Sequence, residues 1–250
     1  VYFPGDPELY FGTPVLLPAP GGPRDLVLED LNGDGHRDIA ATLYAAGEIG
    51  LWQGAGDGTF AAVGRFDSRG QLPHRIQVAD FDGDGKRDLA VSHRHTDDNV
   101  VLFFGDGAFG FPLAQEVLLG ENRATLECEP LDLVVGDFNA DGKPDAAVAC
   151  HSAGEVVVLL NAGVNAERLV SFRVERYGYD EAFPRALAAA DLDNDGADDL
   201  AVALGEANAV GVLITGDGQT ERLRPPRQAL PPSRVPAPLE PSDPELLLEP

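Results

Sequence analysis

Short apolar runs recur along the chain and are separated by segments rich in glycine and aspartate. One set of runs has four mostly apolar residues and begins at Ile39, Leu89, Ala146 and Leu200. A second set follows ten or eleven residues later and begins at Ile49, Val100, Val156 and Val210. Runs this short, bounded by turn-forming residues, are typical of buried strands. Helix-period patterns are hard to find, so the pattern predicts an all-β chain.

The segment before the first of these runs, DLNGDGHRDIA from Asp30, is itself repeated. Related segments begin at Asp80, Asp137 and Asp191, at intervals of 50, 57 and 54 residues. A proline stands seven residues before each of them, at Pro23, Pro73, Pro130 and Pro184. Self-similarity at such a period indicates a repeat architecture.

Each repeat is read as strand, acidic loop, strand, loop, strand, turn, strand. Four antiparallel strands in this order form one blade of a β-propeller, and a blade must pack against neighbours to bury both faces. Residues Val1–Pro18 align with the last two strands of a unit. We therefore expect a propeller of four full repeats plus an N-terminal half blade, either with about five blades or as an open or truncated propeller. It would occupy residues 1–223.

The acidic loops have the residue types and spacing of calcium sites. Calcium binds six to eight oxygen ligands, and side chains at positions one, three, five and nine of a tightly wound loop can supply them, with a backbone carbonyl at position seven. The expected side-chain ligands are Asp30, Asn32, Asp34, Asp38, Asp80, Asp82, Asp84, Asp88, Asp137, Asn139, Asp141, Asp145, Asp191, Asp193, Asp195 and Asp199. The expected carbonyl ligands are those of His36, Lys86, Lys143 and Ala197. The sequence thus predicts up to four structural Ca²⁺ ions.

Two other interpretations of these loops fit the sequence less well. An EF-hand needs a bidentate Glu at position twelve, where this chain has Ala41, Val91, Val148 and Val202. Metal-free Asp-Gly turns need only one or two such residues, whereas these loops carry four at fixed offsets. Calcium is therefore the preferred interpretation.

The loop pattern D-x-[DN]-x-D-G-x-x-D, together with GDGTF from Gly56 and GDGAF from Gly105, resembles the FG-GAP/VCBS repeat family. The chain is similar over roughly residues 1–220 to the integrin α-subunit propeller and to propeller lectins. The resemblance implies a calcium-stabilised propeller, secreted or at a cell surface, with roles such as adhesion and binding of a protein or glycan. The third unit departs from the pattern, with NAGVNAERLVSF from Asn161, and the fourth has GDGQT.

Charge narrows the classes of partner. The chain has 250 residues and a net charge of −24, from 42 acidic and 18 basic residues. This excess disfavours nucleic acid and anionic membrane surfaces. No apolar run approaches the roughly 18 residues of a membrane span. The chain does not begin with Met, and we expect it to be processed or trimmed.

A few other residues are candidates for a disulfide or for transition-metal binding. Cys128 and Cys150 flank two strands that we expect to be neighbours, so a disulfide is geometrically reasonable, with a free thiol pair as the alternative. His93 and His95 have alternate spacing that suits a transition metal, although a solvated polar loop is the simpler interpretation.

Residues 224–250 form a separate proline-rich tail, with proline at nine of 27 positions. Such a segment is extended when alone, and we expect a protein partner to hold it. The leading hypothesis is a non-enzymatic protein-interaction or scaffolding module in an extracellular, cell-surface or periplasmic assembly. The alternatives are a glycan-binding or adhesive propeller and a polysaccharide-active enzyme.

Overall fold

The computed structural model describes residues 14–94, 99–119, 128–179 and 182–216. All regular secondary structure in these ranges is β-strand, arranged in antiparallel sheets. Within the same ranges there is no helix long and apolar enough to cross a membrane. The all-β propeller predicted from the sequence is confirmed.

Four sheets follow one another along the described part of the chain. The first contains β1 (Pro23–Glu29), β2 (Asp38–Leu43), β3 (Glu48–Gly54) and β4 (Phe60–Asp67). The second contains β5 (Pro73–Ala79), β6 (Asp88–His93), β7 (Asn99–Phe104) and β8 (Leu113–Leu118). The third contains β9 (Pro130–Gly136), β10 (Asp145–Cys150), β11 (Glu155–Val164) and β12 (Val170–Gly178). The fourth contains β13 (Pro184–Ala190), β14 (Asp199–Leu204) and β15 (Ala209–Leu213). Within each sheet the strands pair in sequence order.

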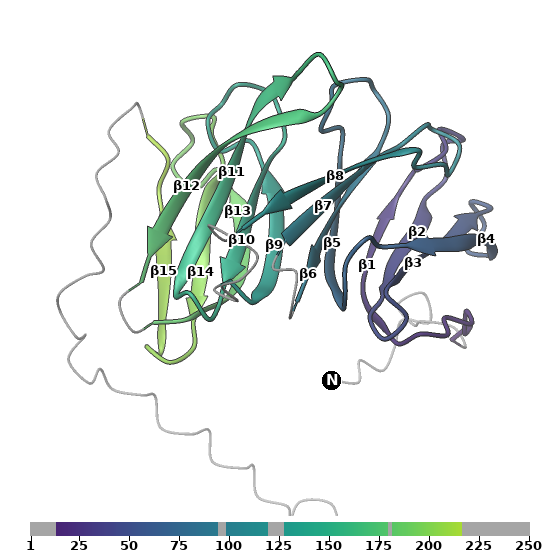
Figure 1. Ribbon diagram of the computed structural model, residues 1–250, viewed down its shortest axis with the longest axis horizontal. Helices are drawn as coiled ribbons and strands as arrows, with labels where there is room; N and C mark the ends of the chain where they lie inside the picture. The colour runs from purple at the N-terminus through teal and green to yellow at the C-terminus, as the bar shows by residue number, and fades with distance from the viewer. Residues whose placement is uncertain (1–13, 95–98, 120–127, 180–181, 217–250) are drawn as a thin grey trace, which may run out of the picture.

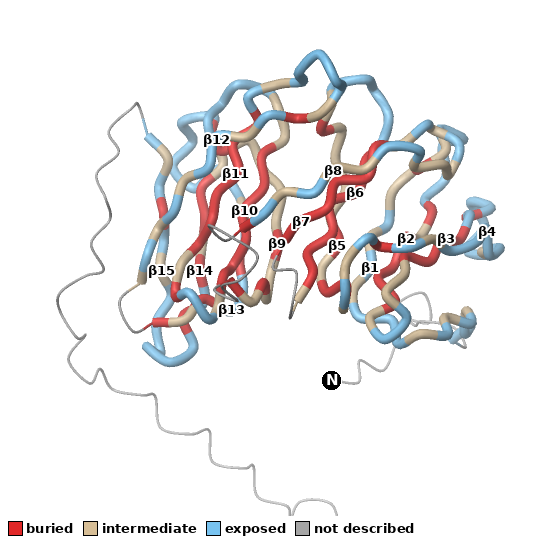
Figure 2. The backbone as a smooth tube through the Cα atoms, viewed as in Figure 1, coloured by how far each residue is buried: buried red, intermediate tan, exposed pale blue. Residues whose placement is uncertain are grey.

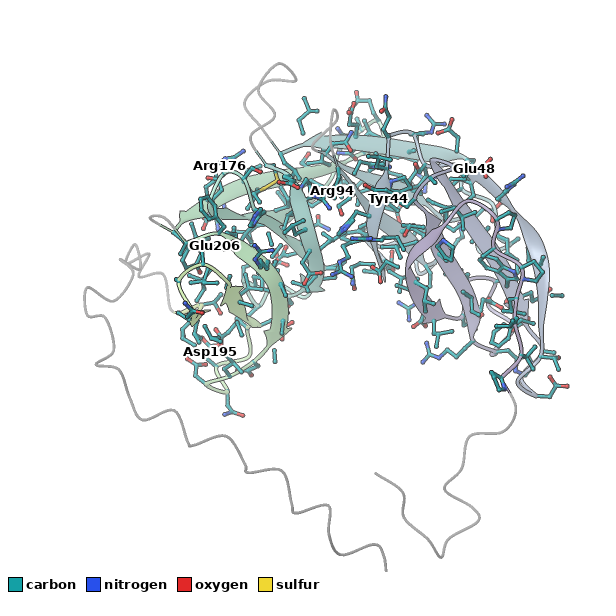
Figure 3. All side chains as sticks on the ribbon, turned by 90° about the horizontal axis from the view of Figure 1, so that it is seen from below. Tyr44, Glu48, Arg94, Arg176, Asp195 and Glu206 are labelled. Carbon is teal, nitrogen blue, oxygen red and sulfur yellow. A yellow bond between two sulfur atoms is a disulfide. The ribbon has the colours of Figure 1, made fainter. Side chains whose placement is uncertain are left out.

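The sheets stand side by side around an arc, with the first and the last at its two ends (Figures 1 and 3). The first strands of neighbouring sheets contact one another, β1 with β5, β5 with β9 and β9 with β13, and so lie on the inside of the arc. Three sheets have the predicted four strands, whereas three strands are described in the last. The expected N-terminal half blade lies mostly outside the described residues, as do the boundary at residue 223 and the proline-rich tail.

Burial follows the position of each strand within its sheet (Figure 2). Every residue of the second and third strands β6, β7 and β10 is buried, which explains their continuous apolar runs. The fourth strand β4 is mostly exposed and alternates only weakly. Buried side chains gather between adjacent sheets. The largest such cluster, which includes Phe81, Leu102 and Leu159, joins the second sheet to the third.

Polar side chains of the inner strands also join the sheets. A carboxylate oxygen of Asp25 accepts the backbone N–H of Ile76 at 3.0 Å, linking the first sheet to the second. Asp132 accepts the N–H of Leu187 at 2.8 Å, linking the third to the fourth. Arg75 lies 3.1 Å from Asp132 and 3.8 Å from Asp25, so one guanidinium contacts the sheets on both sides of its own. Inner strands are therefore held in register with one another as well as packed.

The two cysteines form a disulfide, Cys128–Cys150, which connects the start of β9 to the end of β10. Both are buried in the cluster between the second and third sheets. The bridge fixes the edge of the third sheet next to residues 120–127, which lie outside the described ranges.

We expect reduction of this disulfide to lower the free energy of unfolding by about 3 kcal/mol, because it frees a loop closed over 22 residues in the unfolded chain. The urea midpoint with and without dithiothreitol measures the effect. A Cys128→Ala/Cys150→Ala variant is the control, and its midpoint should not respond to the reductant. An equal midpoint for the oxidised and reduced native chain would contradict the prediction.

Candidate metal centres in the acidic loops

The four acidic loops each connect the first strand of a sheet to the second, at the same end of every sheet. Position six is glycine in all of them, with φ of 86° at Gly35, 85° at Gly85, 79° at Gly142 and 95° at Gly196. This left-handed conformation strains any residue with a Cβ atom. The glycine expected from the sequence is thus needed to reverse the chain so that the acidic side chains face inward.

Each loop is wound around its own carboxylates. In the second loop, Asp80 accepts the backbone N–H groups of Asp84 at 3.0 Å and Gly85 at 2.8 Å. Asp82 accepts the N–H of Asp84 at 3.1 Å, and Asp84 accepts the N–H of Lys86 at 3.0 Å. The other three loops have the same hydrogen bonds. In each, the side chain at position one accepts the N–H of position six, that at position three accepts the N–H of position five, and that at position five accepts the N–H of position seven.

Carboxylate oxygens converge most closely in the second and fourth loops. One ligand atom from each of Asp80, Asp82 and Asp88 lies within 4.8 Å of the others, and the same holds for Asp191, Asp193 and Asp195. The first and third loops have an amide at position three, and it donates to the carboxylate at position five, at 2.9 Å from Asn32 to Asp34 and 3.4 Å from Asn139 to Asp141. These two loops offer one negative charge fewer.

The carboxylate at position nine has a further structural role that the sequence analysis missed. In every loop one of its oxygens accepts the N–H of position two, and the other accepts an N–H of the third strand or of the first or second residue beyond it. Asp38 accepts from Leu31 and Gly54, Asp88 from Phe81 and Gly105, Asp145 from Phe138 and Asn161, and Asp199 from Leu192 and Thr215. These eight distances lie between 2.7 and 2.9 Å. The position-nine carboxylate therefore braces the loop against the sheet.

The position-nine carboxylates are almost fully buried, with at most 1% of the residue exposed. Burial raises the pKa of Asp88 to about 7 and that of Asp145 to about 6. At position five the pKa is shifted in the opposite direction. The pKa of Asp34 is lowered, mainly by the hydrogen bond from the amide of Asn32 and next by the one from the amide of Gln53. A set of oxygen ligands that combines exposed ionised carboxylates with a buried one fits a hard cation, which would offset the charge repulsion and desolvation.

The loops of the second and third sheets border a common cleft of about 750 Å³. Arg168, from the turn between β11 and β12, reaches the second loop and lies 3.5 Å from Asp82 and 3.8 Å from Asp84. The third and fourth loops are joined directly, because the N–H of Asp198 donates to the carbonyl of Asp137 at 2.8 Å. Adjacent loops therefore form a continuous edge at this end of the arc.

The opposite end of the inner strands carries a second group of polar residues that the sequence analysis missed. A cavity of about 420 Å³ there is lined by Arg24, His74, Arg75, Arg94, Glu129, Leu131, His151 and Arg185. Four of the lining residues directly follow the repeated prolines Pro23, Pro73, Pro130 and Pro184, and three of these four are Arg or His, so their recurrence at one position of the repeat was the available signal. His93, a candidate from the sequence, is buried, whereas residues 95–98 lie outside the described ranges.

These features define an all-β propeller built from repeats with an acidic loop between the first two strands. The family model of the FG-GAP-like repeat matches residues 30–91, 80–148 and 137–202. The chain belongs to this family, as the sequence resemblance indicated. No curated protein matches the chain.

Two solved structures are similar in fold. One is a periplasmic gluconolactonase of Pseudomonas aeruginosa, 18% identical, with 81% of this chain and 45% of that chain covered and a TM-score of 0.45. The other is a Bacteroides uniformis protein assigned as a 6-phosphogluconolactonase, 18% identical, with 72% and 55% covered and a TM-score of 0.39. The chain spans about half the length of these structures.

Both structures are named as enzymes, and this finding contradicts the prediction that the chain is a non-enzymatic scaffolding module. Of the alternatives, a polysaccharide-active enzyme is closer to these names. At 18% identity and TM-scores below 0.5, however, this likeness assigns no activity to this chain.

We expect Asp145→Ala to lower the free energy of unfolding by at least about 2 kcal/mol, because the buried N–H groups of Phe138 and Asn161 would lose their acceptor. Urea unfolding measures the change. Asp106→Ala is the matched control, since Asp106 also accepts two backbone N–H groups but in an exposed turn, and its loss should stay within about 0.5 kcal/mol.

Comparing Asp145→Ala with Asp137→Ala distinguishes the contribution of the position-nine hydrogen bonds to stability from that of a metal-ligand carboxylate. Asp137→Ala removes a position-one carboxylate from the same loop, whose N–H partners are exposed to water. It should cost less stability than Asp145→Ala, and equal losses would argue against a bracing role for Asp145.

Proposed function

We propose that this chain is a calcium-stabilised β-propeller that binds up to four Ca²⁺ ions, one in each acidic loop. The observation that carries the proposal is the convergence of Asp80, Asp82 and Asp88, and of Asp191, Asp193 and Asp195, within 4.8 Å. Oxygen-only ligand sets of this kind suit calcium better than transition metals.

In each site the side chains at positions one, three and five would hold the ion. The position-nine carboxylate still has free lone pairs after accepting two N–H bonds, so it can contribute as well. The expected carbonyl ligands of His36, Lys86, Lys143 and Ala197 remain part of the proposal. A bound ion supplies positive charge that offsets the repulsion among the carboxylates and ties the loop to the sheet.

The ions would act structurally, because each loop already joins two strands of one blade and directs its oxygens inward. Calcium at millimolar concentration occurs outside the cytoplasm, and affinities of extracellular modules lie at about 10⁻⁴–10⁻³ M. The disulfide Cys128–Cys150 also favours an oxidising compartment. We therefore propose an extracellular, cell-surface or periplasmic location.

Chelation should lower the melting temperature by several degrees, because removing a ligand that binds only the folded state removes its linkage free energy. Scanning calorimetry with EGTA, followed by excess Ca²⁺, measures the loss and its recovery. Excess Mg²⁺ is the control, since Mg²⁺ demands tighter octahedral geometry and should restore less. An unchanged melting temperature in EGTA would exclude structural calcium.

Asp80→Asn should reduce the calcium bound per chain by about one ion in isothermal titration calorimetry, because it removes the position-one carboxylate that all four loops share while keeping the side-chain shape. Asp106→Asn changes an exposed aspartate outside the loops and should leave the stoichiometry unchanged. Sites with Asn at position three should titrate at higher Ca²⁺ concentration than the other two, since they carry less negative charge.

A further inference from the structure

The cavity at the opposite end of the inner strands is assembled from all four sheets. Arg24 lies on β1, His74 and Arg75 on β5, Leu131 on β9 and Arg185 on β13. Arg94 and His151 follow the ends of β6 and β10 and complete the lining with Glu129. In Figure 3, Arg94 and Tyr44 lie in the middle part of the arc, between the sheets at its two ends. Only the folded arc brings these side chains together.

Positive charge is concentrated here against the trend of the chain. The lining has four arginines and one glutamate, whereas the whole chain has 18 basic and 42 acidic residues. Arg94 pairs with Glu129, Arg185 with Glu206, and Arg75 with Asp132. Arg24 has no carboxylate partner among the described residues, and its guanidinium lies 5.5 Å from the ring centre of Tyr44. The cavity therefore holds one arginine whose charge is not compensated by a direct ion pair.

His74 gives independent evidence for a ligand. The residue is only 4% exposed, and within the described structure neither ring nitrogen has a hydrogen-bond partner. Burial, followed by the nearby charges of Arg94 and Arg24, lowers the pKa of His74 to about 4. At neutral pH the ring thus offers one N–H donor and one acceptor. Leaving such groups unpaired costs about 1–3 kcal/mol, which a bound molecule with hydroxyl groups would offset.

We propose that this cavity binds a small hydroxylated carboxylate, of the size of a sugar acid, with its carboxylate on Arg24 and a hydroxyl on His74. Guanidinium groups recognise carboxylates by paired hydrogen bonds. A volume of about 420 Å³ lies within the range of small-molecule sites.

The charge balance favours a monoanion over a phosphate. Three of the four arginines already face a carboxylate, and Arg75 faces both Asp132 and Asp25, so Arg24 is the one arginine of the lining without a direct ion pair among the described residues. A phosphate dianion would bring more negative charge than the cavity leaves uncompensated. The neutral His74 is also better suited to a hydroxyl than to a second negative charge.

The test is isothermal titration calorimetry of the full chain, at saturating Ca²⁺, with D-glucuronate, D-glucose and inorganic phosphate as separate probes. Glucuronate should bind at least about tenfold more tightly than glucose, which has the same ring without the charge. No heat from glucuronate at 10 mM (roughly the weak limit of specific binding), or tighter binding of phosphate, would overturn the proposal.

Two variants locate the site. Arg24→Gln should weaken glucuronate binding about tenfold or more, and it strands no carboxylate because Arg24 has no ion-pair partner in the described ranges. His74→Phe keeps a buried ring and should also weaken binding, with the melting temperature reporting whether the fold is kept. Arg173→Gln is the matched control, since Arg173 is an exposed arginine on the outer strand β12 that pairs with Glu175. Equal affinity of all three variants would refute this location.

Because the titration is made on calcium-saturated protein and calcium binding is measured separately, the two proposals can fail independently. Loss of glucuronate binding in Arg24→Gln with unchanged calcium stoichiometry supports the cavity. Loss of both would indicate unfolding and would contradict the claim that Arg24 acts locally.

Discussion

One buried carboxylate in each blade determines how the rest of that blade is arranged. The aspartate at position nine of the loop begins the second strand and accepts one N–H from the loop and one from the end of the third strand. Both donors would otherwise be buried without partners, which proteins rarely tolerate. A single side chain thus fixes where the loop closes, where the second strand starts and which part of the third strand lies beside the loop. The same arrangement recurs in all four blades.

The residue that donates its N–H to the position-nine carboxylate also lies next to the carbonyl of loop position eight, and the four blades accommodate this close approach in three ways. At Gly54 and Gly105 an added Cβ would lie 2.1 Å from the carbonyl oxygen of Arg37 or Arg87, so only glycine fits. The third blade has Asn161 instead, and its amide donates to the carbonyls of Pro144 and, across the blade interface, Phe81. In the fourth blade, Thr215 donates its hydroxyl to the carbonyl of Asp198 at 3.3 Å. What looks in the sequence like the loss of a motif is therefore a different partner for the same carbonyl.

The repeat made most of the fold accessible from the sequence. Strand order, loop position and the inward-facing acidic residues follow from local spacing, and spacing is preserved when the chain folds. The brace formed by Asp145 could not be predicted in the same way, because it depends on the N–H of Asn161, whose alignment with Asp145 is set by sheet register. The cavity was even harder to predict from the sequence, because Arg24, His74 and Arg185 belong to different blades and meet only where the inner strands converge. The prediction of a non-enzymatic module had no such local basis and was contradicted.

The inner strands also act as spacers between two kinds of charge. His74 lies six residues before Asp80 along β5, which at about 3.3 Å per residue separates it from the acidic loop by roughly 20 Å. The Debye length at physiological ionic strength is about 8 Å. The acidic end and the basic cavity are therefore electrostatically screened from each other, although they share the same strands. A cation approaching one end and an anion approaching the other are each attracted by a local electric field. The two ends of the inner strands therefore differ in the ions they attract, even though the blades are near copies of one another.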